Sequence, residues 1–193
     1  MSRILQKTGL PIASEPNHPL WQPAYFSLIY RMDKILKVAL WHQFGTSIDM
    51  LENAIAICPE SMWATKANFW YIAFDCYYLD YYLTPNVENY FLPAPFAFTG
   101  SDPTYGQPAR IYTRQELLAY LHSSRTRCHE LIAGMTSELA TSTWTNRSKT
   151  MRFPFFELLL YNMRHVQHHT GQLNLLLRQG INDAPDWITR CAQ

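Results

Sequence analysis

Three histidines lie close together in the stretch RHVQHHTGQLNLLLRQG, residues 164–180. Imidazole nitrogens are common metal ligands and also act as acids or bases near neutral pH. On a helix, His165 and His169 lie about 40° apart on one face and one turn apart along the axis, so both can share a metal ion. The same spacing also occurs in histidine pairs that only pack or face solvent. His168 is turned about 60° from His165, which makes it a neighbour rather than a third ligand.

A carboxylate is the second group that could take part in chemistry. Asp75 lies in the middle of the aromatic segment WYIAFDCYYLDYY, residues 70–82, with no lysine or arginine near it in sequence. A buried carboxylate without a partner is costly, so a metal ion or a charged histidine is its natural compensation. Asp80 lies nearer the end of the segment and is expected to face solvent or to cap a loop. The aromatic residues have helical spacing, which is typical of a core; they are Trp70, Phe74, Tyr77, Tyr78, Tyr81 and Tyr82.

These residues need helices to position them, and the sequence predicts an all-α fold. Apolar residues at steps of three and four predict a helix over 41–58, and the aromatic segment predicts a second one over 64–83. Residues 84–112 hold five prolines, so they are expected to form a long loop. A capping box at Thr113–Glu116 opens a third helix, and a fourth is predicted from Pro154 to Gly180. Four amphipathic helices with one long crossover, between the second and third, predict a four-helix bundle.

Composition limits the class of protein. The 193 residues are 48% hydrophobic and 16% charged with a formal net charge of +1, as expected for one globular domain rather than a nucleic-acid-binding chain. The most basic stretch, NRSKTMR at 146–152, is expected to be a solvated loop. No signal peptide or membrane span is predicted, and the four cysteines are expected to be free thiols, so the prediction is a cytoplasmic protein. His122 and His129 are expected to be solvated or packed at the edge of the core.

The segment YNMRHVQHHTGQLNLLLRQG, together with the earlier FGTSIDMLENAI, resembles the DinB-like superfamily, whose members are damage-inducible four-helix-bundle metalloenzymes. The resemblance covers about residues 38–180, and its most specific part is HxxHHxGQL. The expected organisation is an N-terminal extension over 1–35, with a short helix in AYFSLIYRMDKIL, followed by a DinB-like bundle over 36–193.

The resemblance implies a divalent metal held by one histidine of the second helix and an HxxxH pair of the last helix. The pair corresponds to His165 and His169. Aligning on the preceding tryptophan places Asp75 at the position of the second-helix histidine, whereas aligning on LDYYL places Phe74 there. Asp75 is preferred because a carboxylate can replace an imidazole as a ligand. The predicted metal ligands are therefore Asp75, His165 and His169, around zinc, nickel, iron or manganese.

The resemblance also implies an activity, a small-thiol S-transferase or a hydrolase, and a homodimer. The Pro-rich segment FLPAPFAF (91–98) carries more aromatic surface than a loop normally exposes, so it is expected either to cover the pocket mouth or to pack on a second subunit. Helical spacing nominates Gln172, Asn162, Tyr78 and His168 as supporting, acid or base residues. The alternative is a non-catalytic bundle with a degenerate metal site that binds a small ligand or a partner. In that case Asp75 would pair with His165 or His169 and raise the pKa of the histidine.

Overall fold

The computed structural model describes residues 23–65, 68–99 and 107–191. Two compact units divide the chain, Met1–Val38 and Ala39–Gln193, and each is described by itself. The described part of the first unit is the beginning of α1 (Pro23–Ile57), where Lys37 and Asp33 form an ion pair at 3.0 Å. Residues 1–22 of the predicted extension lie outside the described residues.

The helix that was predicted within that extension is not separate from the bundle. AYFSLIYRMDKIL is continuous with the first bundle helix as part of α1, so the prediction of a short helix of its own is wrong. The physical reason is visible in the sequence, because no glycine or proline interrupts the chain between Pro23 and Gly45.

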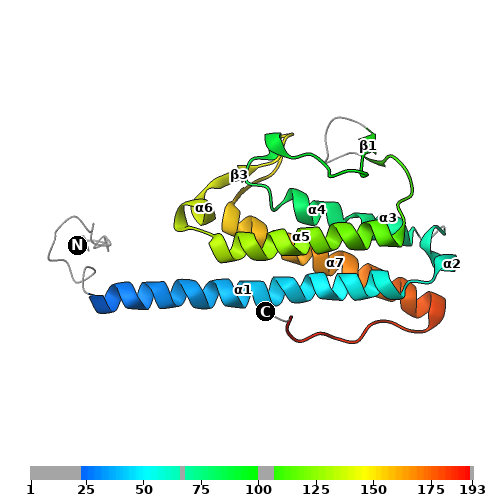
Figure 1. Ribbon diagram of the computed structural model, residues 1–193, viewed down its shortest axis with the longest axis horizontal. Coiled ribbons are helices and arrows are strands. Elements are labelled where there is room, and N and C mark those ends of the chain that lie inside the picture. Colours follow the sequence, from blue (N-terminus) through cyan, green and yellow to red (C-terminus); the bar gives the residue numbers. More distant parts are fainter. Residues whose placement is uncertain (1–22, 66–67, 100–106, 192–193) are drawn as a thin grey trace, which may run out of the picture. The chain divides into compact units, whose positions relative to one another are not determined.

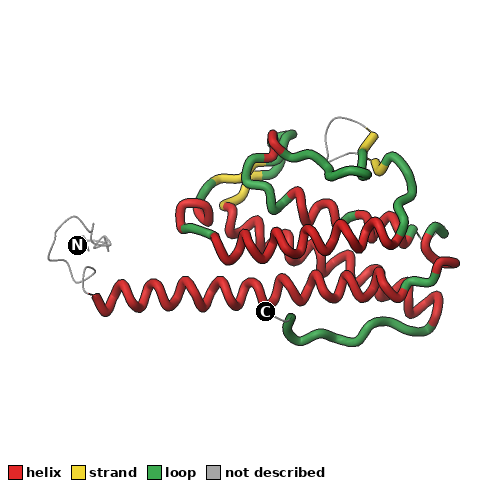
Figure 2. The backbone as a smooth tube through the Cα atoms, in the orientation of Figure 1, coloured by secondary structure: helices red, strands yellow, loops and turns green. Residues whose placement is uncertain are grey.

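The second unit is a helical bundle (Figures 1 and 2). Its long helices are the remainder of α1, α5 (Arg114–Gly134) and α7 (Phe155–Ile181), and the position of the second bundle helix is taken by α3 (Phe69–Phe74) followed by α4 (Cys76–Tyr81). Both α3 and α4 pack against α7 on one side and α5 on the other. The predicted four-helix bundle is therefore confirmed. Its core holds side chains from all four positions, among them Phe44, Ile48, Phe74, Leu121 and Leu159.

Local signals place the starts of α5 and α7 as predicted, whereas α7 runs past its predicted end at Gly180. The Thr113 hydroxyl accepts from the backbone N–H of Glu116 at 3.2 Å, and the Glu116 carboxylate accepts from the N–H of Thr113 at 2.8 Å, which completes the capping box. Pro154 directly precedes α7. Asn182 ends α7 in the left-handed conformation (φ 55°), so Gly180 lies within the last turn instead of ending the helix.

The predicted helix over 64–83 is interrupted. A short α2 (Glu60–Trp63) precedes it. Asn68 lies directly before α3 in the left-handed conformation, with φ 55°, so the backbone is not helical there. A second interruption falls on Asp75, between α3 and α4. The prediction of one continuous helix is therefore wrong, and the second break lies at a candidate ligand.

The predicted crossover loop connects α4 to α5 and contains little regular structure. It includes a 3-10 turn, η2 (Val87–Asn89), and the antiparallel strands β1 (Phe98–Thr99) and β2 (Gln107–Pro108). Between α5 and α7 lie α6 (Ser137–Thr141) and an antiparallel hairpin of β3 (Thr143–Thr145) and β4 (Arg152–Pro154). The sequence did not predict these short strands.

The turn of the β3–β4 hairpin is NRSKTMR, and it is not simply solvated as expected. The side chain of Asn146 is buried and donates to the hydroxyls of Ser148 and Thr150. The guanidinium of Arg147 donates to the carbonyls of Val87, at 3.1 Å, and Tyr90, at 2.7 Å, and so ties the hairpin to the crossover loop.

All four cysteines are free, as predicted, and all four are buried. No helix within the described ranges combines the length and the apolar character needed to cross a membrane.

Candidate functional site

The two candidate histidines lie on α7, at the edge of its buried face. Leu158, Asn162, Val166 and Leu173 of this helix are buried in the bundle, whereas His165 and His169 are half-buried. Their Nε2 atoms are 3.0 Å apart. The pair is thus brought together as its spacing predicted, on the side of α7 that faces α3 and α4.

Asp75 reaches this pair from the interruption between α3 and α4. Its backbone N–H donates to Ile72 at 3.2 Å and its carbonyl accepts from Tyr78 at 3.0 Å, so the chain continues in a near-helical direction across the break. The carboxylate caps neither helix. Instead, its Oδ2 lies 3.3 Å from Nε2 of His169, which is its one ion-pair partner in the part of the chain that the structure describes. Phe74, the other aligned position, is buried and stacks on Tyr112.

Gln172 fixes the orientation of His169. Its Oε1 lies 2.8 Å from Nδ1 of His169, one turn along α7. An amide oxygen accepts hydrogen bonds, so Nδ1 carries the proton and the lone pair of His169 lies on Nε2, directed at His165 and Asp75. Histidine ligands of metals are commonly held in this way by a second group on the other ring nitrogen.

Burial sets the protonation of the three groups. It lowers the pKa of His165 to about 4, with a further contribution from His169, and it also lowers the pKa of His169. It raises the pKa of Asp75 to about 7. The expectation that Asp75 raises the histidine pKa is therefore wrong, because burial disfavours the charged imidazolium and lowers the pKa of both histidines.

Aromatic rings enclose His165 on the side of α4. The ring of Tyr78 meets it edge-on with centroids 5.2 Å apart, Tyr82 lies at 6.1 Å, and Tyr161 of α7 stacks nearly parallel to it at 6.3 Å. These ring contacts pack against the imidazole and limit its rotation.

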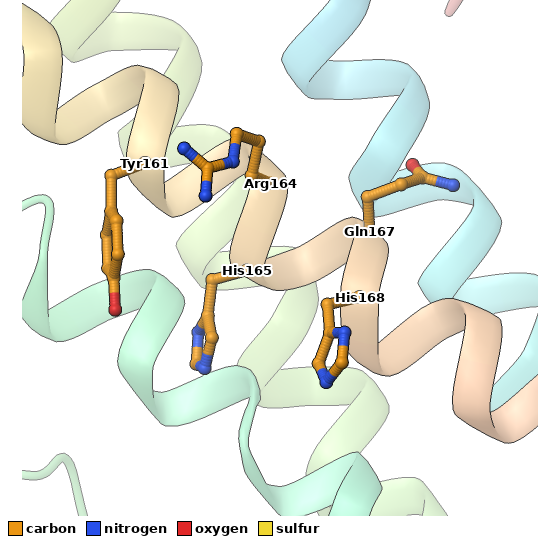
Figure 3. A pocket seen from close by; sticks show the side chains of 5 residues that line it. All are labelled: Tyr161, Arg164, His165, Gln167 and His168. Atoms are coloured by element: carbon orange, nitrogen blue, oxygen red, sulfur yellow. The ribbon is translucent and has the colours of Figure 1, made fainter.

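His165 also lines a pocket of about 470 Å³ on α7, together with Tyr161, Arg164, Gln167 and His168. Figure 3 shows Tyr161, His165 and His168 extending from α7 in the same direction, whereas Arg164 and Gln167 point elsewhere. A small molecule in this pocket can therefore reach the imidazole of His165.

The four nominated supporting residues lie in different settings. Gln172 contacts His169 as described, and Tyr78 contacts His165. Asn162 instead donates to the Leu79 carbonyl at 2.9 Å and joins α7 to α4. His168 is exposed, with its ring 5.2 Å from that of His169. Asn162 is thus a packing contact, and the other three border the candidate site.

The donors do not form a complete metal site as they stand. Across residues 23–65, 68–99 and 107–191, no group of three or more His, Cys, Asp or Glu side chains has the arrangement needed to hold a metal ion. The structure instead holds two pairs that share His169, and the donor atoms within each pair are 3.0 and 3.3 Å apart. Such separations suit two ligands of one ion at bond lengths of about 2.1 Å.

Asp80 belongs to a separate buried network, so the expectation that it faces solvent or caps a loop is wrong. Its side chain is 1% exposed, accepts from the Tyr120 hydroxyl at 3.0 Å and forms an ion pair with Arg127. The Tyr120 hydroxyl also lies 3.1 Å from that of Tyr90 in the crossover loop. This network joins α4, α5 and the loop without reaching the histidines.

The remaining histidine pair, on α5, does not form a second site. Nε2 of His122 lies 2.9 Å from Glu52 of α1 with its side chain 57% exposed, and the ring of His129 packs against Trp41 with centroids 4.4 Å apart. One is solvated and the other lies against a core residue, as expected.

Comparison with known families agrees with the fold. The model of the DinB superfamily matches residues 39–173, which is more than half of the chain and includes Asp75, His165 and His169. The chain belongs to the DinB superfamily. No curated protein and no solved structure matches it. The matched range begins where the second compact unit begins.

Proposed function

We propose that this DinB protein is a metal-dependent enzyme in which Asp75, His165 and His169 hold one divalent ion. The observation that carries the proposal is the convergence of Oδ2 of Asp75 and Nε2 of His165 on Nε2 of His169. Two neutral imidazoles and a carboxyl group bring several electron lone pairs close together with few protons between them. A divalent cation that accepts these lone pairs would stabilise the group. Zinc, nickel, iron and manganese all accept these donors.

The proposed chemistry is transfer of a small thiol or a hydrolytic reaction. A divalent ion lowers the pKa of a bound thiol or water and so supplies a nucleophile near neutral pH. The side chains around the proposed ion would orient its ligands and give the substrate a route to it. Gln172 holds His169 with its Nε2 lone pair directed inward, the tyrosine rings limit the rotation of His165, and the pocket that His165 lines admits the substrate.

A homodimer is part of the proposal. Phe91, at the start of FLPAPFAF, is 80% exposed, which is unusual for a side chain of this size and is expected of a subunit contact. Multi-angle light scattering tests this directly: the wild-type protein should have the mass of two chains, and Phe91→Asp should shift it towards one. A wild-type protein with the mass of one chain would exclude the dimer.

Metal content tests the proposed centre. Purified protein is loaded with zinc, nickel, manganese or, without oxygen, iron(II), and the bound metal is measured by plasma mass spectrometry. We expect about one equivalent in the wild type and little in Asp75→Ala or His169→Ala. His122→Ala, which changes an exposed histidine outside the site, should bind as the wild type does. A wild type that holds no metal under any loading condition would overturn the proposal.

A second candidate function rests on the same Asp75–His169 pair. With the pKa of Asp75 near 7 and that of His169 lowered, a protonated carboxyl can donate to the neutral imidazole. The bundle would then be non-catalytic and would use the pocket beside His165 for a small ligand or a partner. This candidate predicts that NMR titration of the His165 and His169 imidazoles gives the same pKa values with and without added metal, whereas metal binding would remove both titrations.

A further inference from the structure

An arginine of α7 lies beside the candidate site and lines the same pocket as His165. This residue, Arg164, forms no hydrogen bond or ion pair with any residue that the structure describes. We propose that the pocket binds a small organic anion, a carboxylate or a phosphate ester, whose charged group pairs with the guanidinium of Arg164. The role of this anion as a substrate rests on the proposed function, whereas its binding requires no metal ion.

The other arginines of α5 and α7 each have a structural explanation. On α5, Arg125 pairs with an aspartate of α1, Arg127 pairs with an aspartate of α4, and Arg114 donates to a backbone carbonyl. On α7, Arg178 lies in the last turn, where the partial negative charge of the helix C-terminus favours a cation. Arg164 lies in the middle of α7, where neither explanation applies.

The helix neighbours of Arg164 include no acidic residue. Side chains three and four positions away on a helix lie next to each other, and here they are Leu160, Tyr161, Gln167 and His168. No aspartate or glutamate is present among the described residues that line the pocket. A pocket with a permanent positive charge and no negative charge in its wall attracts anions.

The guanidinium group is suited to a carboxylate or a phosphate group. It presents its N–H donors in a planar fork, which can form two parallel hydrogen bonds with two oxygens of one anion. In the view of Figure 3, the guanidinium of Arg164 turns back towards Tyr161, while the rings of Tyr161 and His165 extend together in another direction. The anionic group is therefore expected at the edge of the pocket, and the rest of the ligand beside these rings.

The rings beside Arg164 favour a ligand with a flat or apolar body. Tyr161 and His165 are nearly parallel, with 9° between the ring planes and 6.3 Å between the centroids. Tyr161 is itself packed against Phe153, whose ring stacks on it at 5.5 Å. The pocket volume of about 470 Å³ is ample for a molecule that contains one ring. An anion paired with Arg164 would then place its body against the imidazole of His165.

Three compounds of similar size test the dependence on charge. Benzoate carries a carboxylate, phenyl phosphate carries a phosphate, and benzamide is the neutral counterpart of benzoate. Each is titrated into the full-length protein in the presence of a chelator, and its Kd is obtained from the NMR shifts of the His165 imidazole protons. The titrations are repeated with Arg164→Gln, which removes the charge, and with Arg164→Lys, which keeps the charge without the fork. Arg178→Gln, at an exposed position outside the pocket, is the matched control.

We expect benzoate or phenyl phosphate to bind more tightly than benzamide by about tenfold or more, and the tighter of the two anions identifies the preferred charged group. Arg164→Gln should weaken this binding by about tenfold or more, Arg164→Lys should weaken it less, and Arg178→Gln should leave it unchanged. Because Arg164 is exposed, these substitutions leave the core intact.

Three results would overturn the inference. They are benzamide binding as tightly as both anions, equal effects of Arg164→Gln and Arg178→Gln on the Kd of the anions, and no binding of any of the three compounds. The metal content of the same wild-type protein decides the proposed function separately. Anion binding by a protein that holds no metal would overturn the metal-dependent enzyme and leave the anion site standing, whereas metal binding without anion binding would do the reverse.

Discussion

Asp75 and Asp80 lie five residues apart in one aromatic segment, yet their surroundings differ. Asp80 is buried between two fixed donors, the Tyr120 hydroxyl and the Arg127 guanidinium. Asp75 instead lies beside the imidazole of His169, whose pKa burial lowers. A carboxyl group with fixed donors stabilises the fold, whereas a buried one that faces neutral nitrogens has no positive charge beside it to stabilise its ionised form. Asp80 is thus part of a structural network, whereas Asp75 is not held in this way.

The largest expected effect concerns the structural aspartate. Asp80→Ala removes the buried acceptor that Arg127 and Tyr120 share, and it should lower the free energy of unfolding by about 2–3 kcal/mol, a loss that is moderated because Arg127 is partly solvated. Asp75→Ala should change it by less than about 1 kcal/mol, because it breaks no bond to a fixed charge. Urea unfolding of the metal-free proteins measures both. Equal losses of stability in the two variants would show that Asp75 and Asp80 contribute equally to the fold.

Local signals in the sequence identify much of the fold. The capping box of α5 and the proline before α7 depend on residues next to one another, and the structure confirms both. The continuity of α1 could also have been predicted from the absence of glycine and proline before Gly45. The break at Asp75 has no such signal, because neither residue type occurs between Phe69 and Tyr82.

In the candidate site, too, contacts within one helix could be predicted from the sequence and contacts between helices could not. Helical spacing brings His165, His169 and Gln172 together because all three lie on α7. The contact of Asp75 with His169 joins residues that are far apart in sequence, and only the packing of α3 and α4 on α7 creates it. The burial of Asp80 depends likewise on Tyr120 and Arg127 of α5. The sequence therefore predicts contacts within one helix far better than contacts between residues of different helices.

The next effect concerns the support of His169. Gln172→Ala removes the acceptor of its Nδ1 proton and frees the ring to turn, so metal affinity should fall by about tenfold or more while the free energy of unfolding stays nearly unchanged. Chelator competition measures the affinity. Gln179→Ala, at an exposed position further along α7, is the matched control and should bind as the wild type does. If both variants lose affinity equally, Gln172 has no orienting role.

The smallest effect is the pH dependence of stability in the metal-free protein, because two contributions oppose each other. The pKa of Asp75 is raised from 3.8 to about 7, so the folded state binds more protons than the unfolded state in this range and stability falls as the pH rises through it. The pKa of His165 is lowered from 6.5 to about 4, so the unfolded state binds more protons there and stability rises with pH. Between about pH 4 and 6.5 the two slopes cancel in large part.

Two variants separate the opposing contributions. In Asp75→Asn the contributions of His165 and His169, whose pKa values are both lowered, are no longer opposed by Asp75, and the free energy of unfolding should increase from pH 4 to 6.5. In the double variant His165→Gln/His169→Gln the contribution of Asp75 is no longer opposed by these histidines, and the free energy of unfolding should decrease from pH 4 to 7. Urea unfolding at several pH values in the presence of a chelator measures both slopes. Parallel curves for the two variants would show that Asp75 and the two histidines do not titrate in opposite directions on folding, and that the carboxyl of Asp75 is as well compensated in the metal-free protein as that of Asp80.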